Sequence, residues 1–180
     1  MSTDGFSKIA VIGAGTMGSG IAAQIANAGH EVMLLDLPAH EGADKSPAEM
    51  SIDRLMASDP PQLMHKRNAG RIVSGTISDD FGKLAECDWI IEAVVERLDI
   101  KKDLYARLDD TIGPDCIVSS NTSTIPISLL VEDMPTAFRK RFAITHYFNP
   151  VRYMRLLELV RGTDTGQAVI DRLADFNDRV

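Results

Sequence analysis

The stretch KIAVIGAGTMGSGIA, residues 8–22, decides the fold. Its apolar run from Lys8 to Ile12 predicts a short buried strand, and a helical pattern follows the glycines from Thr16 to Ala28. Gly29 comes after the last periodic residue and predicts the end of this helix. The next run, EVMLLD (Glu31 to Asp36), predicts a second strand. Strand, helix and strand within about thirty residues form a βαβ unit, which favours a parallel sheet.

Gly13, Gly15 and Gly18 form a G-x-G-x-x-G motif in this unit. The motif follows a strand and opens a helix, which is the context that dinucleotide binding requires. Gly13 would permit the tight turn, Gly15 would leave room for a pyrophosphate, and Gly18 would let the helix pack closely on the strand. The helix N-terminus would offer N–H groups to the phosphates. A glycine turn with a purely structural role is the alternative.

Asp36 ends the second predicted strand. An acidic side chain at this place can accept hydrogen bonds from the adenosine ribose hydroxyls and repels a 2′-phosphate. Leu37 and Pro38 follow it and supply no arginine for such a phosphate. The sequence therefore favours NAD over NADP. Asp36 could also cap the following turn, and the two roles are compatible.

The rest of the chain continues the α/β pattern after one interruption. Residues 38–75 predict a projecting helical insertion that could hold part of a ligand, with helices at Ala48–Ala57 and Pro61–Ala69. The elements expected after it are helix Asp79–Glu86, strand Trp89–Val94, helix Ile100–Ile112, a strand in CIVSSNTS, helix Pro126–Glu132, strands Phe142–Tyr147 and Arg155–Val160, and helix Thr165–Val180. The pattern predicts one α/β domain over residues 1–180, a Rossmann-like, doubly wound, mainly parallel sheet with a helical insertion after the second strand.

Composition excludes several classes of protein. The net charge of -7 argues against a nucleic-acid surface, and no apolar run approaches membrane-spanning length. Cys87 and Cys116 lie far apart and are expected to be reduced, and the N-terminus does not resemble a signal peptide. We therefore expect a cytoplasmic protein. His30, His40 and His65 show no paired ligand spacing, so we predict no metal site.

Polar residues follow two of the predicted strands. Glu92 and Glu96 bracket the end of the strand in IIEAVVE, and ligands of open α/β sheets bind beyond the carboxyl ends of strands, so Glu96 is better placed than Glu92. A charge that favours the dipole of the next helix is the alternative for Glu96. The run SSNTS, Ser119 to Ser123, suits a nicotinamide-ribose or substrate contact, and equally a turn with a helix cap.

His146 and Glu158 are the two polar residues in THYFNPVRYMRLLELV, residues 145–160. Pro150 biases the chain between them towards extended or turn geometry. If the flanking strands pair, the two side chains meet, and a carboxylate bonded to one ring nitrogen leaves the other free to act as a base. The alternative is a core histidine satisfied by a backbone carbonyl, with Glu158 exposed at a sheet edge.

Taken together, these motifs resemble the NAD-binding domain of L-3-hydroxyacyl-CoA dehydrogenases. The likeness rests on KIAVIGAGTMGSGIA with Asp36, DWIIEAVVERLDIKKDLYARLD, SSNTSTIPIS and FAITHYFNPVRYMRLLELV, in this order. The family implies oxidation of the 3-hydroxyl of an acyl-CoA to a ketone with NAD, a step of fatty-acid β-oxidation. It implies His146 as the catalytic base, Glu158 as its orienting partner, and Ser123 near the substrate hydroxyl and the nicotinamide ribose.

The resemblance also implies a set of cofactor contacts. These are Gly13, Gly15, Thr16, Met17, Gly18, Asp36, Ala93, Glu96, Lys101, Ser123 and Asn149. In the family the insertion binds CoA, and Lys66 or Arg67 could meet its phosphates.

A helical second domain follows this one in the family, completes the site and forms most of the dimer contact. The chain ends at Val180, so we expect a domain without that part, which binds NAD but turns over acyl-CoA poorly by itself, from a parent that is a homo-oligomer. A related 3-hydroxy-acid or sugar-acid dehydrogenase, and a non-catalytic NAD-binding module, are the alternatives.

Overall fold

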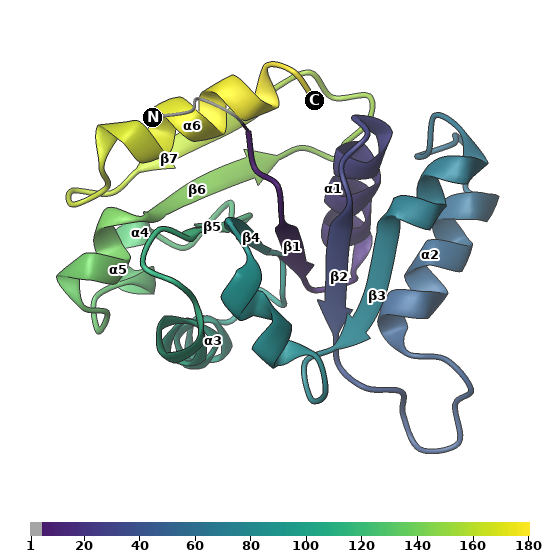
Figure 1. Ribbon diagram of the computed structural model, residues 1–180, viewed down its shortest axis with the longest axis horizontal. Coiled ribbons are helices and arrows are strands. Elements are labelled where there is room, and N and C mark those ends of the chain that lie inside the picture. The colour runs from purple at the N-terminus through teal and green to yellow at the C-terminus, as the bar shows by residue number, and fades with distance from the viewer. Residues whose placement is uncertain (1–4) are drawn as a thin grey trace.

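A single seven-stranded sheet forms the centre of the molecule (Figure 1). The computed structural model describes residues 5–180. The strands follow the order β3-β2-β1-β4-β5-β6-β7, and every neighbouring pair is parallel except β6 and β7. The strands are β1 (Ile9–Ile12), β2 (Val32–Asp36), β3 (Ile72–Thr76), β4 (Trp89–Glu92), β5 (Ile117–Ser120), β6 (Phe142–Tyr147) and β7 (Leu157–Arg161). This confirms the predicted Rossmann-like, mainly parallel sheet.

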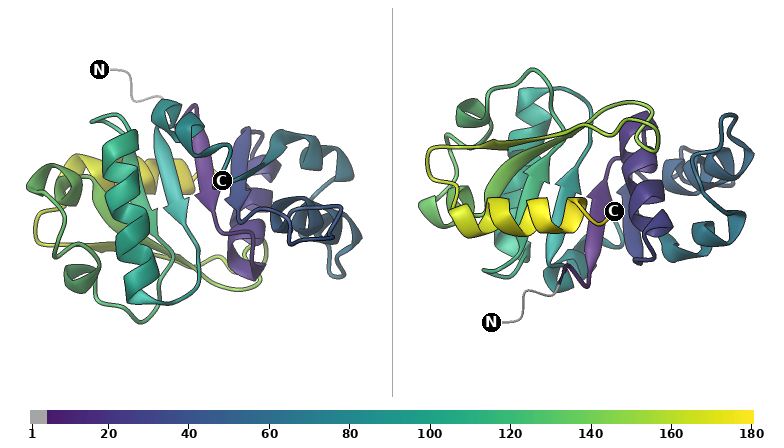
Figure 2. Two further views of the ribbon diagram at one scale, coloured as in Figure 1. Left: turned by 90° about the horizontal axis from the view of Figure 1, so that it is seen from below. Right: turned by 90° about the horizontal axis from the view of Figure 1, so that it is seen from above.

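Helices cover both faces of this sheet, as the two views of Figure 2 show for α3 and α6. They are α1 (Thr16–Asn27), α2 (Pro47–Ala57), α3 (Leu98–Thr111), α4 (Ile127–Leu130), α5 (Thr136–Lys140) and α6 (Gln167–Asn177), with 3₁₀ turns η1 (Lys66–Arg71) and η2 (Phe81–Glu86). One apolar cluster lies between the sheet and α1, α2 and α6, and a second lies between the sheet and α3, α4 and α5. The sheet is therefore doubly wound.

The central strands are buried on both faces, which explains their uninterrupted apolar sequence. In β1, Ile9 and Val11 belong to one cluster, while Ala10 and Ile12 belong to the other. Strands covered on both sides are typical of parallel sheets with helical crossovers. None of the helices in residues 5–180 is long and apolar enough to cross a membrane.

The segment 38–75 differs most from its prediction. The helix expected at Pro61–Ala69 is wrong, because only a 3₁₀ turn forms there, from Lys66 onward. The strand β3 was not predicted at all, yet it pairs with β2 in parallel and makes the segment from α2 to β3 part of the sheet's own crossover. Its sequence, IVSGT, is short and polar, and its residues after Ile72 are exposed or half-buried, as expected of an edge strand.

The short helix α5 was not predicted, and the other predicted elements have boundaries close to those observed, with one change of helix type. The expected helix Asp79–Glu86 is the 3₁₀ turn η2, which begins at Phe81. The strand expected at Arg155–Val160 runs from Leu157 to Arg161. It pairs with β6 in antiparallel fashion and forms the opposite edge of the sheet from β3.

Candidate active site

The glycine loop between β1 and α1 has a different steric reason for each glycine. Gly13 has a φ of 105°, and a Cβ there would lie 2.4 Å from the carbonyl oxygen of Ala93. A Cβ on Gly18 would lie 1.8 Å from the carbonyl oxygen of Gly13. A Cβ on Gly15 would meet no atom within 4 Å, so the space in front of this residue is open. Gly13 and Gly18 are therefore required by the fold, whereas Gly15 borders room for a ligand.

Asp36, at the end of β2, is bound to this loop. Its Oδ2 accepts a hydrogen bond from the Ala14 N–H at 2.5 Å, and its Oδ1 accepts one from the Leu37 N–H at 2.7 Å. The Gly13 N–H donates to the Leu35 carbonyl at 2.7 Å. No turn follows Asp36 directly, so these two contacts tie its carboxylate to the glycine loop and to the next residue and do not cap a turn. Its side chain remains half-buried beside the loop, where a ribose contact stays a prediction.

His146 and Glu158 meet across the antiparallel pair β6 and β7. They are direct partners in the strand register, and His146 Nδ1 lies 2.9 Å from Glu158 Oε2. The His146 side chain is 18% exposed and that of Glu158 is 53% exposed. The histidine is therefore bound to a carboxylate, not to a backbone carbonyl, while Glu158 does lie exposed on an edge strand. With Nδ1 used in this way, Nε2 is the ring nitrogen left for a ligand.

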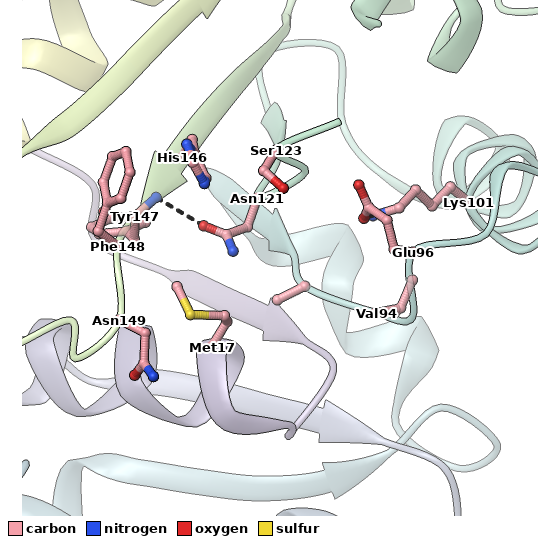
Figure 3. Close-up of a pocket in the computed structure, with 11 residues that line it drawn as sticks. Met17, Val94, Glu96, Lys101, Asn121, Ser123, His146, Tyr147, Phe148 and Asn149 are labelled. Carbon is pink, nitrogen blue, oxygen red and sulfur yellow. Dashed lines mark hydrogen bonds and ion pairs between the residues drawn. The ribbon is translucent and has the colours of Figure 1, made fainter. Parts of the chain in front are cut away.

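The imidazole of His146 also lies against the ring of Phe148, with 4.4 Å between the ring centroids. Both residues line a cavity of about 370 Å³ at the carboxyl edge of the sheet (Figure 3). The residues that line it are Met17, Ala93, Val94, Glu96, Lys101, Asn121, Ser123, His146, Tyr147, Phe148 and Asn149. Seven of the eleven were named from the sequence as catalytic or cofactor contacts, and the cavity brings these seven together.

Val94, Asn121, Tyr147 and Phe148 were missing from the predicted set. Asn121 is the most informative of them, because its Oδ1 accepts a hydrogen bond from the Tyr147 N–H at 2.9 Å (Figure 3). This bond ties the end of β5 to the residue after His146. A polar residue immediately after a parallel strand was the available signal, and Asn121 stood within the noted run SSNTS. Phe148 carried no such signal.

Glu92 is fully buried beneath the cavity. Its carboxylate accepts hydrogen bonds from Lys101 Nζ at 2.7 Å, the Tyr105 hydroxyl at 2.7 Å, the Ser120 hydroxyl at 2.6 Å and the Val94 N–H at 2.9 Å. Burial, and then the charge of Glu92, raise the pKa of Tyr105 well above its ordinary value. Lys101, also fully buried, fits a structural ion pair as well as the predicted cofactor contact.

Glu96 is the more exposed of the two glutamates and lines the cavity, as expected from its place after β4. Its Oε2 lies 3.2 Å from Lys101 Nζ. Burial alone would raise the pKa of Glu96, but the hydrogen bond from Thr122 and the charge of Lys101 outweigh it and hold this pKa below its ordinary value. Glu96 is therefore an anion held in place at neutral pH.

Ser123 lies exposed at the rim of the same cavity, after the end of β5. In Figure 3, Ser123 and Asn121 stand between His146 and the pair of Glu96 and Lys101. The predicted glycine loop and Asp36 do not line this cavity, but Met17 on α1 does, and so does Ala93, which packs against Gly13 and Gly18. Within residues 5–180, no three His, Cys, Asp or Glu side chains are grouped to hold a metal ion.

A family model described as 3-hydroxyacyl-CoA dehydrogenase, NAD binding domain, matches residues 8–180. The chain belongs to this family. The resemblance inferred from its motifs is thereby confirmed, and so is NAD as the cofactor that this domain binds. The loop geometry fits that cofactor, since Gly15 faces open space and is the N-cap of α1 without a side chain to fill the site.

Relatives cover nearly all of this chain. A probable 3-hydroxyacyl-CoA dehydrogenase of Deinococcus radiodurans is 39% identical over 170 residues, which are 94% of this chain and 49% of that protein. The 3-hydroxyadipyl-CoA dehydrogenase of Escherichia coli is 35% identical over 93% of this chain and 35% of that protein. The crystal structure of 3-hydroxybutyryl-CoA dehydrogenase from Escherichia coli superposes with a TM-score of 0.83 and 32% identity, over 98% of this chain and 37% of that one. The chain spans 24% to 49% of the length of the curated relatives that it matches.

Proposed function

We propose that this chain is the NAD-binding part of a dehydrogenase that oxidises the 3-hydroxyl group of an acyl-CoA to a ketone, in fatty-acid β-oxidation. The observation that carries the proposal is the contact of 2.9 Å between His146 Nδ1 and Glu158 Oε2 at the wall of the cavity. A histidine oriented by a carboxylate is the arrangement that general-base chemistry uses. The names of the relatives agree with a 3-hydroxyacyl-CoA as substrate.

In this proposal His146 removes the proton of the substrate hydroxyl with Nε2. Glu158 accepts the Nδ1–H bond, fixes the tautomer and stabilises the imidazolium that forms. Ser123 lies on the same cavity and hydrogen-bonds the hydroxyl that loses its proton. NAD, when bound, would accept the hydride that leaves the carbon bearing this hydroxyl.

The cofactor is held by the remaining predicted residues. The N–H groups of Gly15, Thr16 and Met17, at the N-terminus of α1, donate hydrogen bonds to the pyrophosphate. Asp36 accepts hydrogen bonds from the hydroxyls of the adenosine ribose. Ala93, Glu96, Lys101, Ser123 and Asn149 line the cavity where the nicotinamide end would lie. The exposed start of η1, with Lys66 and Arg67, is the proposed contact for CoA phosphates.

The test measures NADH formation at 340 nm from NAD and 3-hydroxybutyryl-CoA. Because we expect the 180-residue chain alone to be slow, it is used at a concentration equal to that of the substrate, so that a single turnover is visible. We expect His146→Gln to lower the rate by about 10²- to 10⁴-fold, the usual contribution of a general base, and to leave NADH binding unchanged. His40→Gln, in an exposed loop, is the matched control.

Two results would contradict the proposal. Oxidation of a free 3-hydroxy acid at the rate of the thioester would favour a related hydroxy-acid dehydrogenase. Tight NADH binding without any turnover that depends on His146 would favour a non-catalytic NAD-binding module.

A further inference from the structure

Both neighbours of Ser123 donate hydrogen bonds to one oxygen of Glu96. The Thr122 hydroxyl donates to Glu96 Oε1, and the Thr124 hydroxyl donates to the same atom at 3.0 Å. Thr122 is buried, Ser123 is exposed at the cavity, and Thr124 is exposed. The Thr122 hydroxyl also accepts from the Ile125 N–H at 3.1 Å, which closes the turn. Ser123 is therefore held from both sides by a residue of another loop.

Glu96 is itself held by its other oxygen. Lys101 Nζ lies 3.2 Å from Glu96 Oε2 and 2.7 Å from Glu92 Oε1. A lysine ammonium has three donors, and two of them are used by these carboxylates. Since Lys101 and Glu92 are both buried, Lys101 cannot follow Glu96 into solvent without breaking its pair with Glu92.

Glu92 connects this chain of contacts to the sheet and to α3. It lies at the end of β4, and its carboxylate accepts from Tyr105 on α3 and from Ser120 on β5. The contacts thus run from the packed core through Lys101 and Glu96 to the turn that carries Ser123. Buried networks whose polar groups are all paired hold their members rigidly.

We propose that Glu96 is a positioning residue for Ser123 and that the buried pair of Glu92 and Lys101 holds Glu96 in place. Three of the roughly four acceptor positions of the Glu96 carboxylate are used by Thr122, Thr124 and Lys101. In this proposal the main role of Glu96 is to fix the turn that carries Ser123, in addition to its proposed contact with the cofactor. The inference deepens the proposed function, because it concerns the residue assigned to the substrate hydroxyl.

The first test measures the order of the Ser123 backbone amide by ¹⁵N relaxation, which needs neither substrate nor turnover. Thr124→Val keeps the shape of an exposed residue and removes its hydroxyl, whereas Thr124→Ser restores the hydroxyl. We expect Ser123 to become mobile in Thr124→Val and in Glu96→Gln and to stay ordered in Thr124→Ser. Asp99→Asn, which changes an exposed partner of Arg97 at the start of α3, is the matched control. An amide as ordered in Thr124→Val and Glu96→Gln as in this control overturns the proposal.

The second test compares hydride transfer from 3-hydroxybutyryl-CoA in Glu96→Gln, Ser123→Ala and the double variant at saturating NAD. We expect each single change to lower the rate by about ten- to a hundred-fold, the size of effect that misplacing a reacting group produces, without raising the apparent KM in proportion. If Glu96 acts through Ser123, the double variant is no slower than the slower single variant, because both changes remove one interaction. Effects that multiply would show that Glu96 acts independently of Ser123 and would overturn the proposal.

The two tests separate this inference from the proposed function. A wild-type chain that binds NADH but shows no turnover dependent on His146 contradicts the proposed function, and the relaxation experiment still decides the role of Glu96. Emission of Trp89, the one tryptophan of the chain, confirms that each variant is folded.

Discussion

Two parts of the cavity wall hold charged groups in opposite ways. On β6 and β7, His146 has one side-chain hydrogen-bond partner, Glu158, whose side chain is 53% exposed. Beneath the other wall, Glu92 is fully buried and accepts four hydrogen bonds, two from α3, one from β5 and one from the loop after β4. The first pair lies near solvent with few constraints, and the second is closed off and fully paired.

The difference in exposure and pairing fits two roles, catalysis for His146 and support of the fold for Glu92 and Lys101. A base must exchange its proton, so an imidazole with one bonded nitrogen and one free nitrogen near solvent is suited to chemistry. A buried carboxylate and ammonium, in contrast, keep their charges only while they remain paired, because an uncompensated buried charge is costly. The site therefore combines a reacting group that has few contacts, His146, with a buried and fully paired network, Glu92 and Lys101, under the opposite wall of the cavity.

The largest effect is expected from breaking the buried pair. Glu92→Leu leaves Lys101 buried with only Glu96 beside it, and removing one partner of such a pair typically costs about 3–5 kcal/mol of stability. Urea unfolding followed by Trp89 emission measures this change.

The double variant Glu92→Leu with Lys101→Met is the control for charge. Replacing a buried ion pair by apolar residues often leaves the stability unchanged, so the double variant should recover much of the stability lost in Glu92→Leu. The part not recovered corresponds to the hydrogen bonds that the Tyr105 and Ser120 hydroxyls no longer make with Glu92. A single variant as stable as the wild type would mean that the buried network does not hold the fold, and the contrast between the two walls would disappear.

Glu158→Gln tests the wall formed by β6 and β7. In contrast to Glu92→Leu, it should lower the rate of hydride transfer and leave the stability almost unchanged. The Gln amide can donate to Nδ1, which selects the wrong tautomer, so we expect hydride transfer to fall by about 10²-fold or more. The free energy of unfolding should change by less than about 1 kcal/mol, since exposed ion pairs contribute little. Steady-state rates and urea midpoints measured on the same preparation check both parts, and a loss of stability without a loss of rate would assign Glu158 to the fold.

Gly15→Ala tests the open side of the glycine loop, with Gly82→Ala as control. Neither new Cβ would meet an atom within 4 Å, so neither variant should lose much stability. Only Gly15 faces the proposed pyrophosphate site, and we expect its variant to bind NADH about ten-fold more weakly, because the methyl group occupies that space. Equal NADH affinities in a fluorescence titration of the two variants would place the phosphates elsewhere.

The part of the fold that the sequence predicts well is the part with strong local signals. Strand β1, the glycine loop and α1 are read directly from apolar periodicity and glycine spacing, since both depend on near neighbours in the chain. Strand β3 failed because IVSGT carries little apolar pattern and is fixed by pairing with β2, a tertiary contact. The Pro61–Ala69 helix failed for a similar reason, since the Gln62 carbonyl and the Met64 N–H bond to the side chain of Asn27 on α1.

For the site, the sequence predicts single residues better than it predicts contacts. His146 and Glu158 stood out as polar residues in apolar strands, but their register follows from the β6–β7 pairing. The preference for Glu96 over Glu92 at the ligand is consistent with the cavity lining, whereas the reason for Glu92 lies in its contacts with Lys101, Tyr105 and Ser120, which the folded chain brings together. Pairing partners of buried charges are set by the packed fold and leave no local pattern.

Glu96 lies between the two walls in exposure, and its pH dependence should give the smallest effect. The pKa of Glu96 is lowered in the folded protein, so its charged form contributes stability above the unfolded-state pKa, and this contribution is lost as the pH falls through the folded-state pKa. The difference in free energy of unfolding between wild type and Glu96→Gln should therefore be constant from pH 7 to about pH 5 and shrink below about pH 4.5. Because the Glu96 side chain is 40% exposed, solvent screens the contribution and keeps it small. Urea unfolding at several pH values measures the difference; one that grows on acidification would mean that burial, and not Thr122 and Lys101, dominates the environment of Glu96.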